Sequence, residues 1–150
     1  MNRPAIEFEA RNPRFAEHLR AGLVTMPIVH ALGLRFVRIE PGEVEIEMPF
    51  ADQWSFRSGQ FQATPIFAVA DFAGVCAAGT LIPEGWSMST VDVTLKIVGP
   101  ALAGPLRAVG RVLKSGKLLT VSEASVFAFD GRSDSLCANA LLTGRNLPPS

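Results

Sequence analysis

The sequence predicts an α+β fold in which one antiparallel sheet wraps around a single long, buried helix. Almost half of the 150 residues are hydrophobic, which is enough for one compact core. Residues 64–80 form one long, almost uncharged apolar run. On both sides of it, short stretches alternate between apolar and polar residues, as half-buried strands do. A sheet that closes around one apolar helix accounts for both observations.

The chain before the central run predicts two helical pieces and two strands. Apolar residues at helical spacing indicate a helix over 13–25, and Pro27 begins a second short piece over 27–31. Residues 34–39 are typical of a strand, and Pro41-Gly42 of a turn. The next strand alternates strictly, with one apolar face and one face that we expect to be solvated. The apolar face comprises Val44, Ile46, Met48 and Phe50, and the acidic face comprises Glu43, Glu45 and Glu47.

The central helix is predicted over residues 64–80. Thr64 is a good N-cap and Pro65 suits the first helical position. The segment is apolar almost all round, so we expect most of its surface to be buried. Gly74 and Gly79 would be costly in an exposed helix and indicate another backbone packed close by.

Four strands are predicted after the helix, over 87–98, 106–114, 118–129 and 135–143, with hairpin turns at 115–117 and 130–131. In the first of them Val91, Val93, Leu95 and Ile97 are expected to share a face opposite Thr90, Asp92, Thr94 and Lys96. We therefore expect one domain over 1–150, with a helical segment over 13–31 and a core over 33–143.

Charge and cysteine content exclude several classes of protein. Fourteen basic and fourteen acidic side chains cancel, which is unlike the basic surface of a nucleic-acid-binding protein. The most apolar stretch, 58–83, contains Asp71 and polar residues, which argues against a membrane span. The N-terminus has no apolar signal-peptide core, so a cytoplasmic location is expected. Cys76 and Cys137 are expected as reduced core thiols, with one disulfide as the alternative.

Asp71 is the residue that most clearly indicates chemistry. It is the only carboxylate between Arg57 and Glu84, and it lies in the most apolar helix. Burying a carboxylate is expensive unless a partner or a cavity receives it, and the surroundings of such an acid can tune its basicity. The alternative is a structural acid that accepts backbone hydrogen bonds or contacts a second subunit.

The start of the same helix is a second candidate. Unpaired N–H groups and the helix dipole at 59–65 can polarise a carbonyl and stabilise an oxyanion, and Gln60 and Gln62 can add amide donors. Every helix has an N-terminus, so this observation is weak alone.

Several short motifs together resemble the hot-dog thioesterases of the phenylacetate-pathway, or PaaI-like, type. Gln62-Ala63-Thr64 with Asp71 nine residues after Gln62 resembles their His-Gly-Gly or His-Ala-Gly motif and its acid. The resemblance covers roughly residues 33–143 and includes FAGVCAAGT (72–80), LIPEG (81–85), STVD (89–92) and GRVLKSGKL (110–118). It implies the hot-dog fold and hydrolysis of an acyl-coenzyme A thioester.

The resemblance also implies roles for individual residues. Asp71 would be the general base or nucleophile, the Ala63 amide would hold the thioester oxygen, and Thr90 or Ser89 would position water or the acid. Gln62 and Ala63 of one subunit would act with Asp71 of the other, in a homodimer or a tetramer of two dimers. The remaining substrate contacts would come from Gln60, Phe61, Thr64, Gly116 and Lys117, the last two beside the coenzyme A phosphates.

Three positions depart from the pattern: Gln62 replaces the motif His, Phe56 stands where Asn or Gln is frequent, and Pro65 removes a backbone donor. An acyl-CoA-binding protein without turnover is therefore a second hypothesis, and hydratase or dehydratase action a third. No metal or separate cofactor is expected: His18 and His30 complete no ligand pattern, and coenzyme A enters as part of the substrate.

Overall fold

The computed structural model describes residues 6–102 and 104–150. In chain order the elements are α1 (Phe15–Val24), α2 (Pro27–Leu32), β1 (Arg35–Glu40), β2 (Glu43–Met48), the 3₁₀ turn η1 (Asp52–Trp54), β3 (Ser55–Arg57), β4 (Gln60–Phe61), α3 (Ala63–Gly79), β5 (Ser87–Ile97), β6 (Leu106–Ser115), β7 (Leu119–Phe129) and β8 (Asp134–Leu147).

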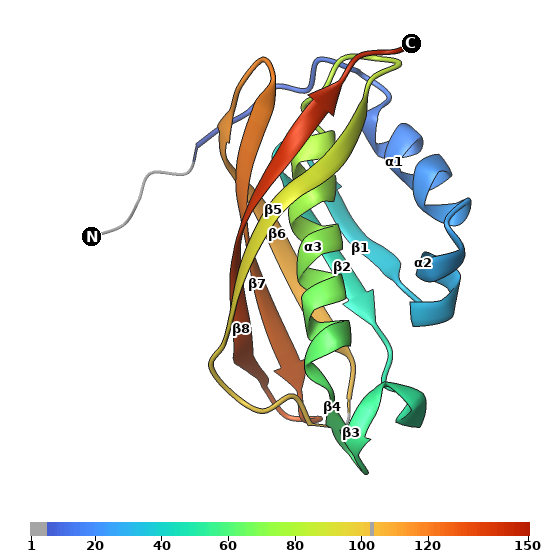
Figure 1. Ribbon diagram of the computed structural model, residues 1–150, viewed down its shortest axis with the longest axis vertical. Coiled ribbons are helices and arrows are strands. Elements are labelled where there is room, and N and C mark those ends of the chain that lie inside the picture. Colours follow the sequence, from blue (N-terminus) through green and yellow to red (C-terminus); the bar gives the residue numbers. More distant parts are fainter. Residues whose placement is uncertain (1–5, 103) are drawn as a thin grey trace.

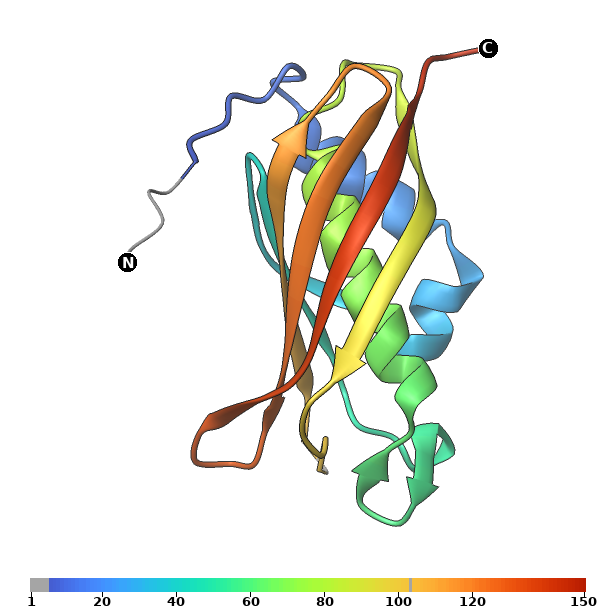
Figure 2. The ribbon, with the colours of Figure 1, turned by 60° about the vertical axis from the view of Figure 1, so that its left-hand side comes forward.

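The main sheet is antiparallel and six-stranded, in the order β1-β2-β6-β7-β8-β5. It curves around α3, which lies along its concave face (Figures 1 and 2). Helices α1 and α2 lie beside α3 near the β1 edge, whereas the described helices leave the β5 edge open (Figure 1). The predicted α+β arrangement of a sheet wrapped around one long helix is confirmed.

The core forms where α3 meets the concave face. On β2, Val44, Ile46 and Met48 are fully buried, as their alternation predicts. Most of α3 is buried too, and only its first turn and the stripe that includes Phe67 and Asp71 escape the sheet. Because the neighbours of α3 are apolar on nearly every side, the absence of a polar face follows from its position.

The start of α3 lies two residues earlier than the sequence predicts. Gln62, and not Thr64, is the N-cap residue: its side-chain oxygen accepts a hydrogen bond from the Thr64 N–H. Pro65 is consequently the third helical residue, where its missing N–H would have had no intrahelical partner in any case. Glutamine is an uncommon N-cap, which is why the more usual Thr-Pro start predicted the wrong boundary.

Helix α3 packs directly on the backbone of β6 and β7. A Cβ atom at Gly110 would overlap the carbonyl of Ala73, and the Ser122 hydroxyl donates to the Gly74 carbonyl at 2.9 Å. The predicted close backbone is therefore present beside Gly74, although Gly74 itself mainly accommodates the side chain of Leu142. At Gly79 the prediction is wrong, because a side chain, that of Leu19, fills the space.

The acidic face of β2 is not simply solvated, contrary to the prediction. Glu43, Glu45 and Glu47 are half-buried beneath arginines of neighbouring strands on the convex face. Their ion pairs are Arg38–Glu43, Arg111–Glu43, Arg107–Glu45 and Arg35–Glu47. Burial raises the pKa of Glu43, but the hydrogen bonds from Arg38 and Arg111 outweigh burial and leave that pKa below its ordinary value.

A β-bulge in β5 overturns the predicted alternation of that strand. The register with β8 shifts between Thr90 and Asp92, so Val91 is an extra residue. Thr90 therefore faces α3, as Val93 and Leu95 do, while Val91 is 60% exposed. Period two in the sequence could not reveal this, because one inserted residue reverses the alternation before it.

Three further features differ from or complete the sequence analysis. The β3–β4 hairpin was not predicted, because its strands are too short to show an alternation. Strand β8 extends to Leu147, four residues beyond the predicted end. Cys76 and Cys137 are free and buried, which confirms the reduced thiols.

The contact between Gly110 and α3 gives a stability prediction. Gly110→Ala places a methyl group against the backbone carbonyl of Ala73, which cannot move without shifting the helix. We expect a loss of about 3 kcal/mol in the free energy of unfolding, measured by urea denaturation.

The matched control is Gly22→Ala in exposed helix α1, where a Cβ atom has no neighbour within 4 Å. Because alanine has the higher helix propensity, this variant should gain up to about 1 kcal/mol. Equal stabilities of the two variants would contradict the proposed packing constraint.

Candidate active site

Asp71 is held in the exposed stripe of α3 by a hydrogen bond from the adjacent edge strand. The Thr90 hydroxyl donates to the Asp71 carboxylate at 2.7 Å. Burial raises the pKa of Asp71, and the hydrogen bond from Thr90 opposes that rise without cancelling it. The arrangement leaves a half-buried, oriented carboxylate whose basicity is higher than that of an ordinary aspartate.

The first turn of α3 is fixed by the segments that lead into it. The Phe61 N–H donates to the Ala101 carbonyl at 2.8 Å, and the Gln62 N–H donates to the Trp54 carbonyl at 2.9 Å. Ala63 is the first helical residue, so its N–H lies outside the intrahelical ladder, while the Thr64 N–H is occupied by the Gln62 side chain. An exposed backbone donor therefore stands at the positive end of the helix dipole.

A groove of about 320 Å³ opens at this helix start. Of the sequence-predicted site residues it collects Gln60, Phe61, Gln62 and Ala63, but Thr64 is not part of its wall. The rest of the wall is uncharged and mostly apolar, and it comprises Phe56, Ile66, Ile97, Gly99, Pro100 and Ala101. Phe61 is only 2% exposed and packs edge-to-face on Phe50, with ring centroids 5.0 Å apart, so it acts chiefly as a rigid wall.

Within one chain, the groove and Asp71 do not meet. Asp71 follows Ala63 by eight helical residues, a rise of roughly 12 Å along α3. Reacting atoms must approach to roughly 3–3.5 Å, so one thioester cannot contact the Ala63 N–H and the Asp71 carboxylate of the same chain. The described chain thus carries two separate candidate regions, the helix start and Asp71, which we call half-sites.

The other sequence-predicted residues lie apart from these half-sites. Ser89 is exposed and precedes Thr90 on β5, so it projects from the opposite face of the strand. Gly116 and Lys117 form the turn between β6 and β7, at the end of the molecule away from the β3–β4 hairpin (Figure 1). Sequence reasoning missed the buried Asn146, whose side chain donates to the Gly116 and Lys117 carbonyls at 2.8 and 3.1 Å and fixes that turn.

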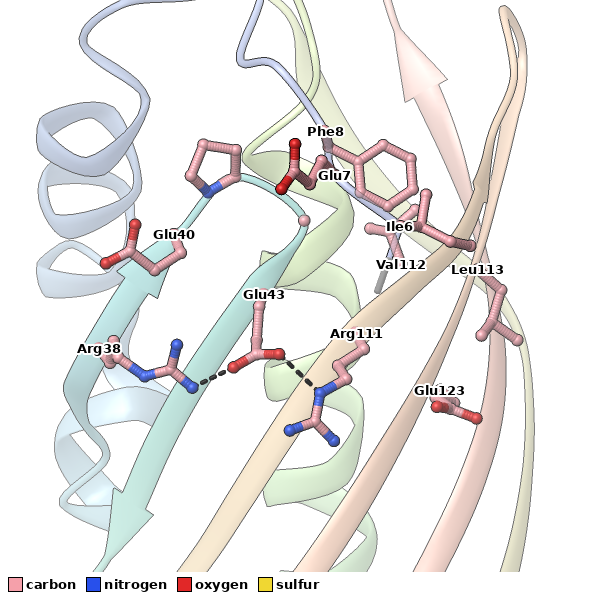
Figure 3. Close-up of a pocket in the computed structure, with 12 residues that line it drawn as sticks. Ile6, Glu7, Phe8, Arg38, Glu40, Glu43, Arg111, Val112, Leu113 and Glu123 are labelled. Carbon is pink, nitrogen blue, oxygen red and sulfur yellow. Dashed lines mark hydrogen bonds and ion pairs between the residues drawn. The ribbon is translucent and has the colours of Figure 1, made fainter. Parts of the chain in front are cut away.

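A second groove, of about 590 Å³, lies on the convex face beneath residues 6–8 (Figure 3). Figure 3 shows Glu43 between Arg38 and Arg111, with the ring of Phe8 above the β1–β2 turn. Asp71 and the start of α3 do not contribute to it. Arg38 and Arg111 in this groove already pair with Glu43, so we do not assign them a role in catalysis.

The two cysteine thiols are not activated as nucleophiles. Burial and the nearby charge of Asp71 raise the pKa of Cys76 to about 12, and burial raises that of Cys137 to about 11, so both thiols stay protonated at neutral pH.

In residues 6–102 and 104–150, His, Cys, Asp and Glu side chains form no cluster able to hold a metal ion. None of the helices described here combines the length and apolarity that a membrane crossing requires.

The open β5 edge adjoins Asp71 and carries exposed apolar side chains among polar ones. Val91, Ile97 and Val98 are between 48% and 61% exposed along this edge, and Phe67, one turn before Asp71 on α3, is 41% exposed. An eleven-residue edge strand presents unpaired backbone groups along its whole length. A surface of this kind is typical of a strand that another chain covers.

Comparison with known proteins gives this arrangement a context. A thioesterase family protein from Silicibacter pomeroyi superposes with a TM-score of 0.87 and is 28% identical, covering 89% of this chain and 98% of that one. The PaaI protein of the phenylacetic acid degradation operon of E. coli superposes with a TM-score of 0.81 at 17% identity, over 94% and 99% of the two chains, and supports the fold alone. A predicted esterase of Saccharolobus solfataricus is 25% identical over 101 residues, 67% of this chain and 71% of the relative. No family model matches the sequence.

The six-stranded sheet around α3 is the hot-dog fold, as the sequence resemblance implies. In sequence and fold the chain is similar to this thioesterase family protein, and in sequence to the esterase.

The hydrogen bond between Thr90 and Asp71 gives a prediction about acidity. Thr90→Val removes the one interaction that lowers the pKa of Asp71, so that pKa should rise further above its ordinary value. The carboxyl carbon signal of Asp71, followed by NMR during a pH titration, measures the change. Thr94→Val, an exposed substitution on the same strand, is the control and should leave this titration unmoved.

Proposed function

We propose that this protein hydrolyses an acyl-coenzyme A thioester. The observation that carries the proposal is the half-buried Asp71, held by Thr90 in an apolar helix next to an open edge strand with exposed apolar side chains. Similarity to a thioesterase family protein and to an esterase supports thioester hydrolysis as the reaction class. The uncharged groove at the start of α3 supports an apolar acyl group as the part of the substrate that enters it.

The chemistry needs a base or nucleophile and an oxyanion donor. In one route Asp71 accepts a proton from water, and the hydroxide formed attacks the thioester carbon. In the other, the Asp71 carboxylate attacks that carbon itself, and water then hydrolyses the anhydride. In both routes the carbonyl oxygen becomes negative, the Ala63 N–H and the dipole of α3 stabilise it, and its collapse expels the thiolate of coenzyme A, which takes up a proton.

The working site is proposed to form between two copies of the chain. The Ala63 N–H and Asp71 are too far apart within one chain, and the exposed apolar β5 edge lies next to Asp71. Antiparallel pairing of two β5 edges brings the α3 start of one copy toward the middle of α3 of the other, because the two-fold axis reverses the direction of the second helix. The dimer is thus a requirement of the chemistry, and a tetramer of two dimers would use another surface.

An acyl-ligand-binding role is the second candidate, and Gln62 favours it. We propose that this glutamine stands in place of the motif His. Its side-chain oxygen already caps the helix, and its amide cannot transfer protons. Thermal stabilisation by acyl-CoA without release of thiol, unchanged in Gln62→His, would support binding over hydrolysis.

Ala63→Pro tests the oxyanion donor. Proline is favoured at the first helical position, and Gln62 before it has the extended backbone that a following proline requires (φ −76°, ψ 159°). The substitution therefore removes the N–H while keeping the helix. We expect kcat for acyl-CoA hydrolysis to fall by about 10²–10³-fold, measured as release of free thiol.

The control for that substitution is Ala63→Gly, which retains the N–H and should keep kcat within about threefold of the wild type, since capping is unchanged. An active Ala63→Pro enzyme would show that this amide does not hold the oxyanion.

Mixing two inactive variants tests the shared site. Asp71→Asn and Ala63→Pro each inactivate both sites of a homodimer, but a mixed dimer has one site that keeps the intact residue from each chain. After unfolding and refolding together in equal amounts, about half of the dimers are mixed, and about a quarter of the wild-type activity should return. Recovery of no activity from a mixture shown to contain mixed dimers would place both residues in the site of a single chain.

A further inference from the structure

Arg57 is held in a defined orientation on the β3–β4 hairpin. Its guanidinium donates from Nε and Nη2 to the side-chain oxygen of Gln60, at 2.9 and 2.7 Å. The same guanidinium lies over the ring of Phe56, with 5.2 Å between Cζ and the ring centroid. Two hydrogen bonds and an aromatic surface restrict a side chain that is otherwise exposed and mobile.

The charge of Arg57 is not neutralised by these contacts. Gln60 offers a neutral amide oxygen, and within the part of the chain that the structure describes Arg57 forms no ion pair with a carboxylate. Arg35, Arg38, Arg107 and Arg111 on the convex face, by contrast, all pair with glutamates. Since a guanidinium has five N–H donors and two are engaged, three donors and the full positive charge remain for a ligand.

The position of Arg57 relates this charge to the groove at the start of α3. The two residues that orient it, Phe56 and Gln60, both line that groove, whose wall contains no charged side chain. A ligand that fills the groove and reaches its rim would meet an apolar wall first and then one cation. Such a surface suits an amphipathic molecule with an uncharged body and one oxyanion.

We propose that Arg57 binds an oxyanion of the substrate while the groove holds its apolar part. The oxyanion is either a phosphate of the carrier or a carboxylate at the far end of the acyl chain, because a guanidinium recognises both by the same planar, charge-assisted hydrogen bonds. The inference rests on the proposed function only in taking the groove as the place where the substrate binds.

The test uses binding rather than turnover, so that it does not depend on hydrolysis. Three stable ketone analogues, in which a methylene replaces the thioester sulfur, separate the sources of the oxyanion: hexanoyl-CoA, hexanoyl-pantetheine and adipoyl-pantetheine. Their dissociation constants are measured by calorimetry with the full chain. Arg57→Leu removes the charge, Arg57→Lys keeps the charge without the planar donors, and Arg11→Gln removes an exposed cation from the N-terminal segment, at the other end of the molecule (Figure 1).

If Arg57 binds a carrier phosphate, Arg57→Leu weakens only the CoA analogue, by about tenfold, and raising the salt concentration weakens the wild type more than the variant. If it binds an acyl carboxylate, the variant weakens only the adipoyl analogue by a similar factor. Arg57→Lys should lie between the wild type and Arg57→Leu, and Arg11→Gln should match the wild type. Circular dichroism melting curves of the variants check that folding is unchanged.

Changes of less than about twofold for all three analogues in Arg57→Leu would overturn the inference, as would an equal loss for all three, which would indicate a damaged groove. These outcomes are independent of catalysis. An active thioesterase that is indifferent to Arg57→Leu refutes this site alone, whereas selective binding through Arg57 by a protein that releases no thiol refutes hydrolysis and keeps the site.

Discussion

Helix α3 lies so close to the strands β6 and β7 that contacts with their backbone and side chains set its position on the sheet. Gly110 lets the Ala73 carbonyl approach the sheet, and the Ser122 hydroxyl donates to the next carbonyl, that of Gly74. A carbonyl inside its own helix needs no second partner, so this hydrogen bond serves to fix the helix along and around its axis. Both half-sites lie on α3, and this contact therefore determines where the Ala63 amide and the Asp71 carboxylate stand relative to the β5 edge.

The two half-sites place opposite demands on the helix. At its start, the positive end of the dipole and an unpaired N–H favour negative charge on a ligand. Two turns later, apolar surroundings disfavour the charge of Asp71 and raise its pKa, so that the carboxylate becomes a better base. A single apolar helix can provide both the hydrogen-bond donor and the base. The donor is a backbone N–H, so Asp71 is the one side chain of the pair that has to be polar. The roughly 12 Å between them is too long for one substrate carbonyl, a difficulty that the proposed dimer would remove by supplying a second copy of the same helix.

Most of the helices and strands, and the candidate acid, could be predicted from the sequence, because each is specified by residues that are close together in the chain. The apolar run of α3, the alternation of β2 and the hairpin turns depend on neighbouring residues. A single carboxylate within that run, Asp71, marks a candidate functional residue in the same way. The sequence did not predict the glutamine cap, the bulge at Val91 or the β3–β4 hairpin. A cap by Gln62 is rare, a bulge is defined by the partner strand, and a two-residue strand has no periodicity. The groove wall was missed in part because Pro100 and Ala101 reach it through the folded connection after β5, and Ile97 is the last residue of that strand.

The bulge in β5 does more than correct an alternation. One additional residue lets the same short stretch of chain face inward at Thr90 and outward at Val91, so the hydrogen-bond partner of Asp71 and an exposed apolar side chain of the edge are neighbours along the backbone. Any displacement of the edge strand by a second copy would reach the Asp71 carboxylate through a single peptide bond. If two copies pair through β5, as proposed above, their pairing acts on the basicity of Asp71.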